Sequence, residues 1–224
     1  MTYRNQVTQP SLAKMANLLD EGCYFVANSG QAGLAMAAGP GLVATAPFLL
    51  VVNNNPVSAP KTIWLDYLNL TNTVAGSAAS GLTFLAATAI IDSGNRYSSA
   101  GTQLTPVNPN MNSAAASLGL VYAGAPVATA ASGNARTVIG QRNVRPAVSG
   151  TAATVVGDDI MFNFGGIEGE TAGNIVVANP NLIPVACPAI AIGPQQSALI
   201  YLYYAAATTP VAAQFAAEFG YWER

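Results

Sequence analysis

Few side chains in this 224-residue chain could carry out chemistry. Histidine is absent, so the commonest general base and metal ligand is missing, and nucleophile systems that pair serine or cysteine with histidine are excluded. The two cysteines, Cys23 in "GCYFVA" and Cys187 in "VACPAI", lie in apolar settings that favour buried thiols, and a disulfide between them stays open. Because the carboxylates are few and scattered, we expect a protein that is not an enzyme and has no cofactor.

Four acidic residues flank one expected strand and raise the question of a calcium site. Asp158 and Asp159 stand in "VGDDI" at its start, and Glu168 and Glu170 stand in "GIEGET" after its end. Calcium prefers oxygen ligands of this kind. However, nine positions separate Asp159 from Glu168, which is ~30 Å along an extended strand. We therefore expect these acids to lie in turns without a metal.

Two further clusters could contact a partner. Arg136, Arg142 and Arg145 stand together in "ARTVIGQRNVRP". Their forked guanidinium groups could bind carboxylates of a neighbouring protein or a glycan, or form ordinary salt bridges within the chain. Aromatic residues close to the C-terminus could stack on sugar rings, although packing in a core or an interface is the commoner use of such side chains. They are Tyr201, Tyr203, Tyr204, Tyr221 and Trp222.

The chain carries little charge. Only 8% of its residues are charged, where roughly 25% is typical, and three runs carry no charge at all: 22–60, 97–135 and 171–217. Since interface cores are depleted in charge, we expect much of the surface to be buried against other chains; the alternative is a small neutral monomer. The net charge of −2 and the absence of a basic stripe argue against nucleic-acid binding.

Residues 1–44 differ from the rest and predict an arm that attaches the protein to its neighbours. Ser11 can cap a short helix that ends at Gly22. The apolar stretch 32–52 is long enough to cross a bilayer, but Gly39-Pro40-Gly41 would break a spanning helix, so we expect no membrane partner. The apolar side of the short helix is made by Leu12, Met15, Leu18 and Leu19.

From residue 45 onward, apolar runs separated by Gly, Asn and Pro predict roughly eight to ten strands. An all-β, antiparallel, jelly-roll-like β-sandwich over residues 45–224 fits this number better than an immunoglobulin-like domain. The strand in "KTIWLDYLNLT" would have two apolar faces, so we expect it between layers or in a subunit interface. Strict alternation would place Ile63, Leu65 and Tyr67 on one face and Trp64, Leu68 and Leu70 on the other.

The closing residues "FGYWER" continue the last expected strand, so the C-terminus should be tied into a sheet. Phe219 and Tyr221 should face the core and Trp222 the opposite side. Glu223 and Arg224 should mark the solvent edge.

The polar stretch 92–113, "DSGNRYSSAGTQLTPVNPNMNS", is longer than most structureless loops. Its two prolines and four asparagines can order the chain without a strand. Arg96 and Tyr97 stand at its root, and both residue types are enriched at interfaces. We therefore predict contact with a neighbouring subunit or a ligand; the alternative is a solvent-facing connection.

Several blocks of the sequence resemble a group of tailed-bacteriophage virion proteins. They include "IIDSGNRYSSAGTQLTPVNPNMNSAAAS", "VVGDDIMFNFGG", "AIAIGPQQSALIYLYY" and "FGYWER", in this order, within residues 45–224. The resemblance implies a jelly-roll structural component of a phage particle, located in the virion after assembly in the host cytoplasm. It brings no catalytic residues, and residues 1–44 fall outside it.

The resemblance and the composition together lead to one leading function and one alternative. The leading function is a non-enzymatic capsid decoration (cement) or head-fibre or spike subunit that binds virion proteins such as the major capsid protein. The alternative is a glycan- or receptor-binding module on the virion surface. Because three-fold sites are frequent in icosahedral shells, the resemblance also implies a homotrimer. The candidate interface residues are Leu12, Met15, Leu18, Leu19, Trp64, Arg96, Tyr97, Arg142, Arg145 and Trp222.

Overall fold

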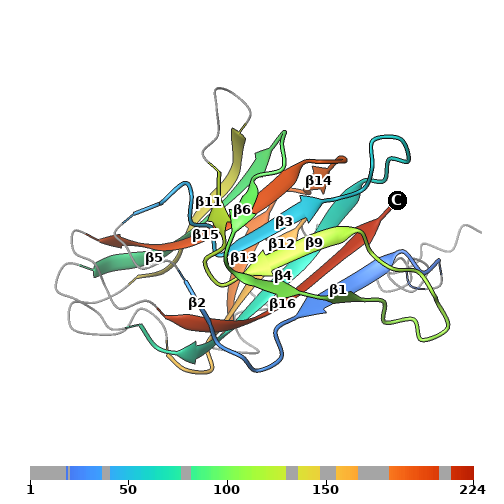
Figure 1. The fold of residues 1–224 in the computed structure, drawn as a ribbon. Helices are drawn as coiled ribbons and strands as arrows, with labels where there is room; N and C mark the ends of the chain where they lie inside the picture. The colour runs from blue at the N-terminus through green and yellow to red at the C-terminus, as the bar shows by residue number, and fades with distance from the viewer. Residues whose placement is uncertain are drawn as a thin grey trace, which may run out of the picture.

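Alternating apolar side chains build two β-sheets that lie face to face (Figure 1). We call these sheets A and B. The computed structural model describes residue 19 and residues 21–36, 41–76, 82–129, 136–146, 155–165, 182–206 and 213–224.

Sheet A is built around the long strands β4 and β16. Its main order is β13-β12-β4-β16-β1-β8, with β14 beside β4 and β2 beside β16. Neighbouring strands run antiparallel except for β12 and β13, which are parallel. The bounds are β1 Tyr24–Asn28, β2 Leu34–Ala35, β4 Ile63–Val74, β8 Pro106–Val107, β12 Asp159–Phe164, β13 Leu182–Cys187, β14 Ala191–Ile192 and β16 Gln214–Glu223.

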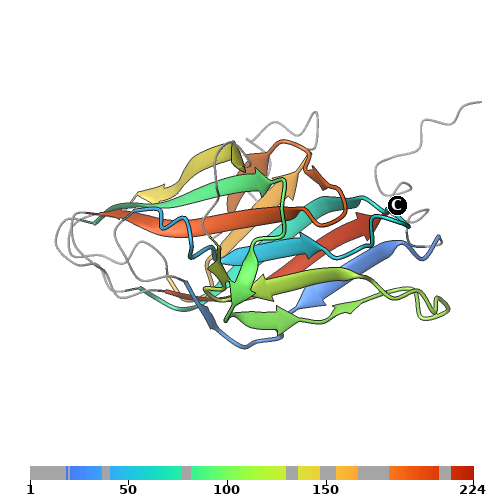
Figure 2. The same cartoon turned by 45° about the horizontal axis from the view of Figure 1, so that its top comes forward.

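Sheet B lies in front of sheet A in Figure 2 and has the order β11-β5-β15-β3-β9-β7. All of its neighbouring strands are antiparallel. Two short strands, β6 and β10, pair with each other and form a separate ribbon. The bounds are β3 Leu49–Asn53, β5 Leu82–Asp92, β6 Tyr97–Ser99, β7 Thr102–Leu104, β9 Gly119–Ala123, β10 Val127–Ala128, β11 Arg136–Pro146 and β15 Ser197–Ala206.

The predicted all-β sandwich is confirmed. Ten of the described strands have five or more residues, which agrees with the expected number. The consecutive strands β3, β4 and β5 alternate between sheets B and A, and β15 and β16 return to lie beside them. Because β15 lies between β3 and β5 while β16 lies beside β4, the sheets are interleaved in a jelly-roll-like manner.

The core lies between the inner faces of the two sheets and is rich in aromatic rings. Phe48 meets Phe215 edge to face, with ring centroids 5.9 Å apart. Large aromatic side chains contribute most to the free energy of core packing. The largest fully buried side chains of this core include Phe48, Phe162, Phe215, Phe219 and Tyr221.

Strand β4 contradicts the prediction of two apolar faces, because a β-bulge interrupts its alternation. Gly220 of β16 pairs with Tyr67, whereas the next residue, Tyr221, pairs with Leu65, so Asp66 is an extra residue. Asp66 and Tyr67 consequently both point away from the core. The residues that do face the core, each at most 1% exposed, are Ile63, Leu65, Leu68 and Leu70. The strand therefore has one apolar and one polar face.

The predicted boundary of the N-terminal arm at residue 44 is wrong. β1 pairs with β16 along its whole length, and β2 pairs with the other end of the same strand. Phe25, Leu34 and Met36 are buried in the core. These two strands cover an edge of β16 that would otherwise expose unpaired backbone groups, so the sandwich begins near residue 24. Of the expected helix, Leu19 is helical, and Leu12, Met15 and Leu18 lie outside the described residues.

The C-terminus is tied into sheet A, as predicted. Phe219 and Tyr221 are fully buried, and Trp222 lies on the opposite face. The expectation of a solvent edge holds for Arg224 but not for Glu223, which is 3% exposed. The Glu223 carboxylate accepts hydrogen bonds from Ser117 Oγ and from the backbone N–H of Gly119, and these partners stabilise its burial.

The polar stretch 92–113 is more regular than predicted, because it contains β6, β7 and β8. Its asparagines then hold the chain that enters β1. Asn108 donates to the carbonyl of Gly22 at 2.7 Å, and Asn110 donates to the carbonyl of Leu19 at 3.0 Å. The stretch is therefore an ordered connection that fixes the end of the N-terminal segment.

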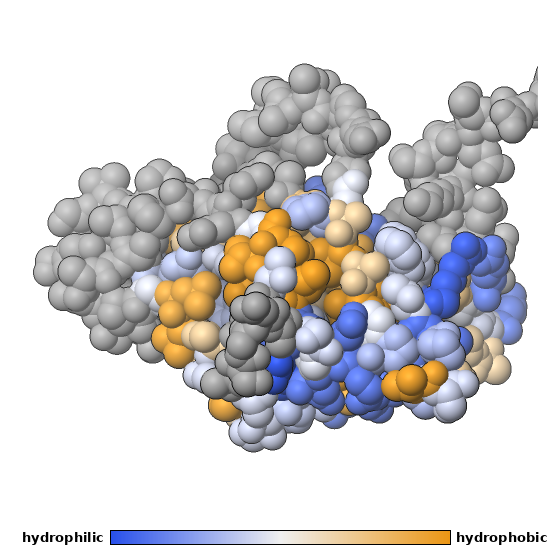
Figure 3. Space-filling view, turned by 90° about the horizontal axis from the view of Figure 1, so that it is seen from above, coloured by the Kyte–Doolittle hydropathy of each residue, from blue (hydrophilic) through white to orange (hydrophobic). Residues whose placement is uncertain are grey.

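The outer face of sheet B carries a second apolar cluster. Leu50, Val52 and Leu199 are fully buried in it. The β6–β10 ribbon lies over this face (Figure 2), and Tyr97 of the ribbon stacks on Tyr122 with ring centroids 3.7 Å apart. Figure 3 shows apolar side chains gathered near the middle of the molecule on this side.

Candidate binding face on sheet A

The outer face of sheet A is the part of the described surface where aromatic and polar side chains gather. Alternation along β1, β4 and β16 places their outward residues in rows that cross the sheet. The first row is Tyr24, Trp222 and Trp64; the second is Val26, Gly220 and Tyr67; the third is Asn28, Glu218 and Asn69. We call these three rows the polar face.

The first row brings the two tryptophans together. Trp64 and Trp222 are direct cross-strand partners. Their rings are nearly parallel, with an interplanar angle of 7° and centroids 6.4 Å apart. Trp64 is 38% exposed, which is high for a side chain of this size. The pair therefore presents flat aromatic surface at one end of the polar face.

The bulge in β4 creates two tyrosine–carboxylate pairs in the middle of this face. The Tyr24 hydroxyl donates to Asp66 Oδ2 at 2.8 Å, and the Tyr67 hydroxyl donates to Glu218 Oε1 at 2.5 Å. Gly220 lies beneath both rings, where a Cβ would overlap Tyr67 Cε1 and the Tyr24 hydroxyl. Only glycine therefore lets the two tyrosine rings lie against the sheet and reach their carboxylates.

Both tyrosines remain protonated donors over the physiological range. Burial raises the pKa of Tyr24 well above its usual value, and the neighbouring Asp66 carboxylate raises it further. Burial also raises the pKa of Tyr67, and its hydrogen bond to Glu218 adds to the effect. Because the hydroxyls stay neutral, each pair holds its carboxylate in place without adding charge.

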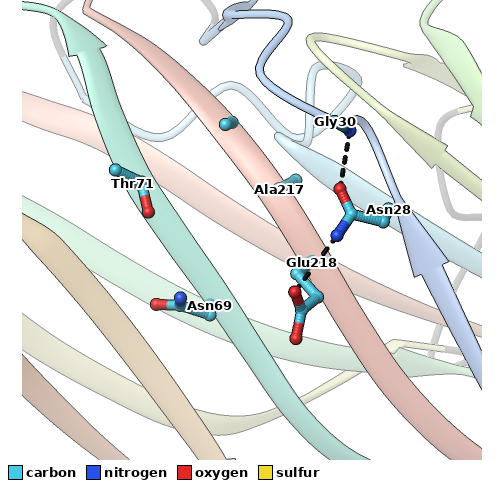
Figure 4. A pocket seen from close by; sticks show the side chains of 7 residues that line it. Asn28, Gly30, Asn69, Thr71, Ala217 and Glu218 are labelled. Atoms are coloured by element: carbon cyan, nitrogen blue, oxygen red, sulfur yellow. Dashed lines mark hydrogen bonds between the residues drawn. The ribbon is translucent and has the colours of Figure 1, made fainter.

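The third row lines a shallow hollow of about 90 Å³ (Figure 4). Asn69 and Thr71 approach it from β4, Glu218 from β16, and Asn28 and Gly30 from the end of β1. Asn28 connects Glu218 to Gly30 at the rim of the hollow. Its Nδ2 donates to Glu218 Oε2 at 3.1 Å, and its Oδ1 accepts from the Gly30 N–H at 2.6 Å. Asn28 and Glu218 are therefore already held in place at the rim of the hollow.

One polar atom beside this hollow is not satisfied. Asn69 Oδ1 is buried and has no hydrogen-bond partner among the described residues. Its neighbour Thr71 donates to Asp159 Oδ1 at 2.6 Å, on the next strand. An unsatisfied buried acceptor costs free energy, so Asn69 is a place where an additional donor would stabilise the protein.

The polar face offers hydrogen-bond acceptors and aromatic surface but no cation. Asp66, Glu218 and Asp159 supply carboxylates, and the described residues that line the hollow include no Lys or Arg. No group of three or more potential metal ligands occurs within the described residues. Such a face disfavours anionic ligands.

Of the ten predicted interface residues, five have side chains that the structure describes, and among these five it brings Trp64 and Trp222 together. Arg96 pairs with buried Asp92 at 2.7 Å, and Tyr97 stacks on Tyr122, so both side chains are used within the chain. Arg142 and Arg145 lie on β11, whose backbone alone is described at these positions. Contact of these residues with a neighbouring subunit stays a prediction.

The other sequence-derived clusters have structural roles where they are described. Tyr201, Tyr203 and Tyr204, like Tyr221, are buried, so these four do not form a sugar-stacking surface. Asp158 accepts a hydrogen bond from the backbone N–H of Val155 in its own turn. Glu168 and Glu170 lie outside the described residues. Cys23 and Cys187 are not joined in a disulfide, and Cys187 is buried in the core.

The sequence pattern did not point to five residues of the polar face: Tyr24, Asn28, Tyr67, Asn69 and Glu218. Tyr24 and Asn28 were assigned to the arm, although "YFVAN" alternates in the way a short strand does. Strict alternation places Tyr67 on the same face as Ile63 and Leu65, because an alternation rule cannot foresee a bulge. The glycine of "EFGYWE", opposite a tyrosine, was the available signal for a bulge or a close approach.

Comparisons with known proteins add no relatives. No protein-family model, curated protein or solved structure matches the chain. Over the residues that the structure describes, no helix is long and apolar enough to cross a membrane.

Proposed function

We propose that this chain is a non-enzymatic structural subunit of a phage particle, either a capsid decoration protein or a head-fibre or spike subunit. The observation that carries the proposal is the scarcity of charge on the described surface. Of the described charged side chains, only Glu21, Lys61 and Arg224 are exposed, and two of these pair with each other. A monomer that must stay dispersed normally carries far more surface charge.

Exposed apolar side chains are more numerous than exposed charged ones. Among the residues that the structure describes, twelve large hydrophobic ones are exposed, including Val57 at 74%, Val107 at 58% and Met111 at 95%. Single exposed apolar residues are ordinary on any protein. With so few charges between them, however, they support a surface that neighbouring subunits cover in an assembly, since interface cores are depleted in charge.

One end of the sandwich supports an attachment point. Glu21 and Arg224 form an ion pair there, and Asn108 and Asn110 hold the carbonyls of Gly22 and Leu19. The segment that precedes Leu19 therefore starts from a fixed place. In this proposal that segment binds a neighbouring virion protein, such as the major capsid protein.

Self-association and capsid binding test the proposal separately. Light scattering of the 22.8 kDa chain should give about three times the monomer mass, and a stable monomer at micromolar concentration would count against the trimer.

The full chain should co-sediment with phage capsids that lack it. A chain beginning at Leu19 should keep its fold but not co-sediment, whereas a chain with residues 1–18 scrambled in order controls for length and composition. Co-sedimentation of the shortened chain would contradict attachment through the arm.

A further inference from the structure

We propose that the polar face of sheet A binds an uncharged oligosaccharide. The Trp64–Trp222 pair would stack on one sugar ring, and Glu218, Asn28 and Asn69 would bind the hydroxyl groups of the next. This inference concerns ligand binding by the single chain, so it does not depend on assembly into a particle.

The hydrogen-bonding inventory favours a ligand that is rich in hydroxyl groups. The Glu218 carboxylate accepts from Tyr67 on one oxygen and from Asn28 on the other, and each oxygen has a further lone pair. Sugar hydroxyls donate and accept, so they can satisfy carboxylate and amide groups together.

The aromatic pair favours the flat, apolar side of a sugar ring. Trp64 and Trp222 stack nearly parallel across two strands, and Trp64 stays 38% exposed, so the pair presents aromatic surface to a ligand. A pyranose ring has an apolar face of CH groups and a rim of hydroxyls. That division matches aromatic rings in the first row and polar groups in the third.

The spacing of the rows sets the length of the ligand. Trp222 and Glu218 are four residues apart on β16, which is ~13 Å along the strand and longer than one pyranose ring. The hollow of about 90 Å³ is too small to enclose a whole ring but accepts its hydroxyl groups. An oligosaccharide lying along the strand would reach both ends.

The charges select against acidic sugars. Asp66, Glu218 and Asp159 place three carboxylates on or beside the face. A sialic or uronic acid would bring a like charge close to them, which disfavours binding. A lysine ammonium would suit the carboxylates, but it only donates hydrogen bonds and cannot accept one from an asparagine amide.

The face is organised before any ligand arrives. The Tyr24 and Tyr67 hydroxyls fix the two carboxylates, and the Asn28 side chain is held between Glu218 and the Gly30 N–H. Gly220 gives both tyrosine rings their space. Groups that are held in place lose little conformational entropy on binding.

The experiment is a glycan array followed by titration calorimetry on the full chain. The array carries neutral hexose oligosaccharides, sialylated and uronic-acid oligosaccharides, and an oligolysine peptide. We expect binding to at least one neutral oligosaccharide. Trp64→Ala and Glu218→Gln should each weaken it tenfold or more, Trp64→Phe should retain part of it, and Val138→Ala, an exposed change on sheet B, should leave it unchanged.

Melting temperature and light scattering accompany each variant, so a folding or assembly defect is separated from lost binding. The inference is overturned by an array without any neutral ligand, or by binding to acidic sugars or oligolysine alone. Neutral binding that Trp64→Ala and Glu218→Gln both leave intact overturns it equally, because the site would then lie elsewhere.

Discussion

The two outer faces of the sandwich differ in what covers them. On sheet B, Leu50, Val52 and Leu199 are fully buried beneath a layer that includes the β6–β10 ribbon. On sheet A, tyrosine, carboxylate and amide groups bond to one another, and Trp64 remains 38% exposed. The outer face of sheet B is therefore covered by other parts of the same chain, whereas the outer face of sheet A keeps polar groups near the solvent.

The difference begins in the strands. The whole of β3, "LLVVN", is buried, as is typical of a strand with a layer on each side. The strands β4 and β16 alternate between buried and partly exposed residues, as is typical of a sheet with one side open. The outer face of each sheet is therefore covered or open according to the side chains that its strands place there. The open face of sheet A should tolerate substitutions better than the covered face of sheet B.

The largest effect should come from deleting residues 219–224. This removes Phe219 and Tyr221 from the core, at roughly 3–5 kcal/mol for each large aromatic, which approaches the total stability of a domain. The deletion also removes the Glu223 carboxylate, which accepts hydrogen bonds from Ser117 Oγ and the Gly119 N–H. We expect insoluble protein on expression. A deletion variant that melts within a few degrees of the full chain would show that the end of β16 is peripheral.

A pair of substitutions compares the two faces directly. Leu199→Ala should lower the free energy of unfolding by about 2–5 kcal/mol, because Leu199 is fully buried on the covered face of sheet B. Trp64→Ala, on the open face of sheet A, should cost about 1 kcal/mol or less. Urea unfolding of both variants measures the difference. Equal losses would mean that the two faces are equally covered.

Releasing the ribbon should have an intermediate effect. Tyr97→Ala removes the stacking on Tyr122, at about 0.5–1.5 kcal/mol beyond the area that is buried. Hydrogen exchange should then rise in β6 and β10 while β4 and β16 stay protected. Tyr97→Phe retains the ring and should exchange like the wild type. Unchanged exchange in Tyr97→Ala would show that the backbone bonds, and not the stack, hold the ribbon.

The smallest effect concerns alkaline pH. The pKa values of Tyr24 and Tyr67 are raised in the folded protein, while tyrosines in the unfolded chain titrate near pH 10. Their contribution to stability is therefore complete below about pH 10 and decreases as the pH rises above it. Urea unfolding at several pH values should show this decrease, and it should be shallower in a Tyr24→Phe, Tyr67→Phe double variant. Equal slopes would contradict the pKa assignment.

Much of the fold could be predicted from the sequence, because its strands are short apolar runs bounded by turn residues. The inward positions of Phe219 and Tyr221 and the outward position of Trp222 were predicted correctly from alternation. The order of the strands in each sheet could not be predicted, because it depends on long-range pairing such as that of β1 with β16.

The candidate site could be predicted only in part. Trp64 and Trp222 were each singled out, but their contact depends on the cross-strand register of β4 and β16. The tyrosine–carboxylate pairs depend on a single extra residue, Asp66, which turns Tyr67 outward. A one-residue change in register exchanges the two faces of a strand, so a pattern alone cannot place such a site.

The central claim is that sheet A keeps an open face with both tryptophans on it. Since Trp64 and Trp222 are the two tryptophans of the chain, selectively excited tryptophan fluorescence reports on this face alone. Acrylamide should quench the emission of the native protein efficiently, and a bound neutral oligosaccharide should reduce that quenching. Native quenching as weak as that of fully buried tryptophan would show that the face is covered, and would contradict the claim.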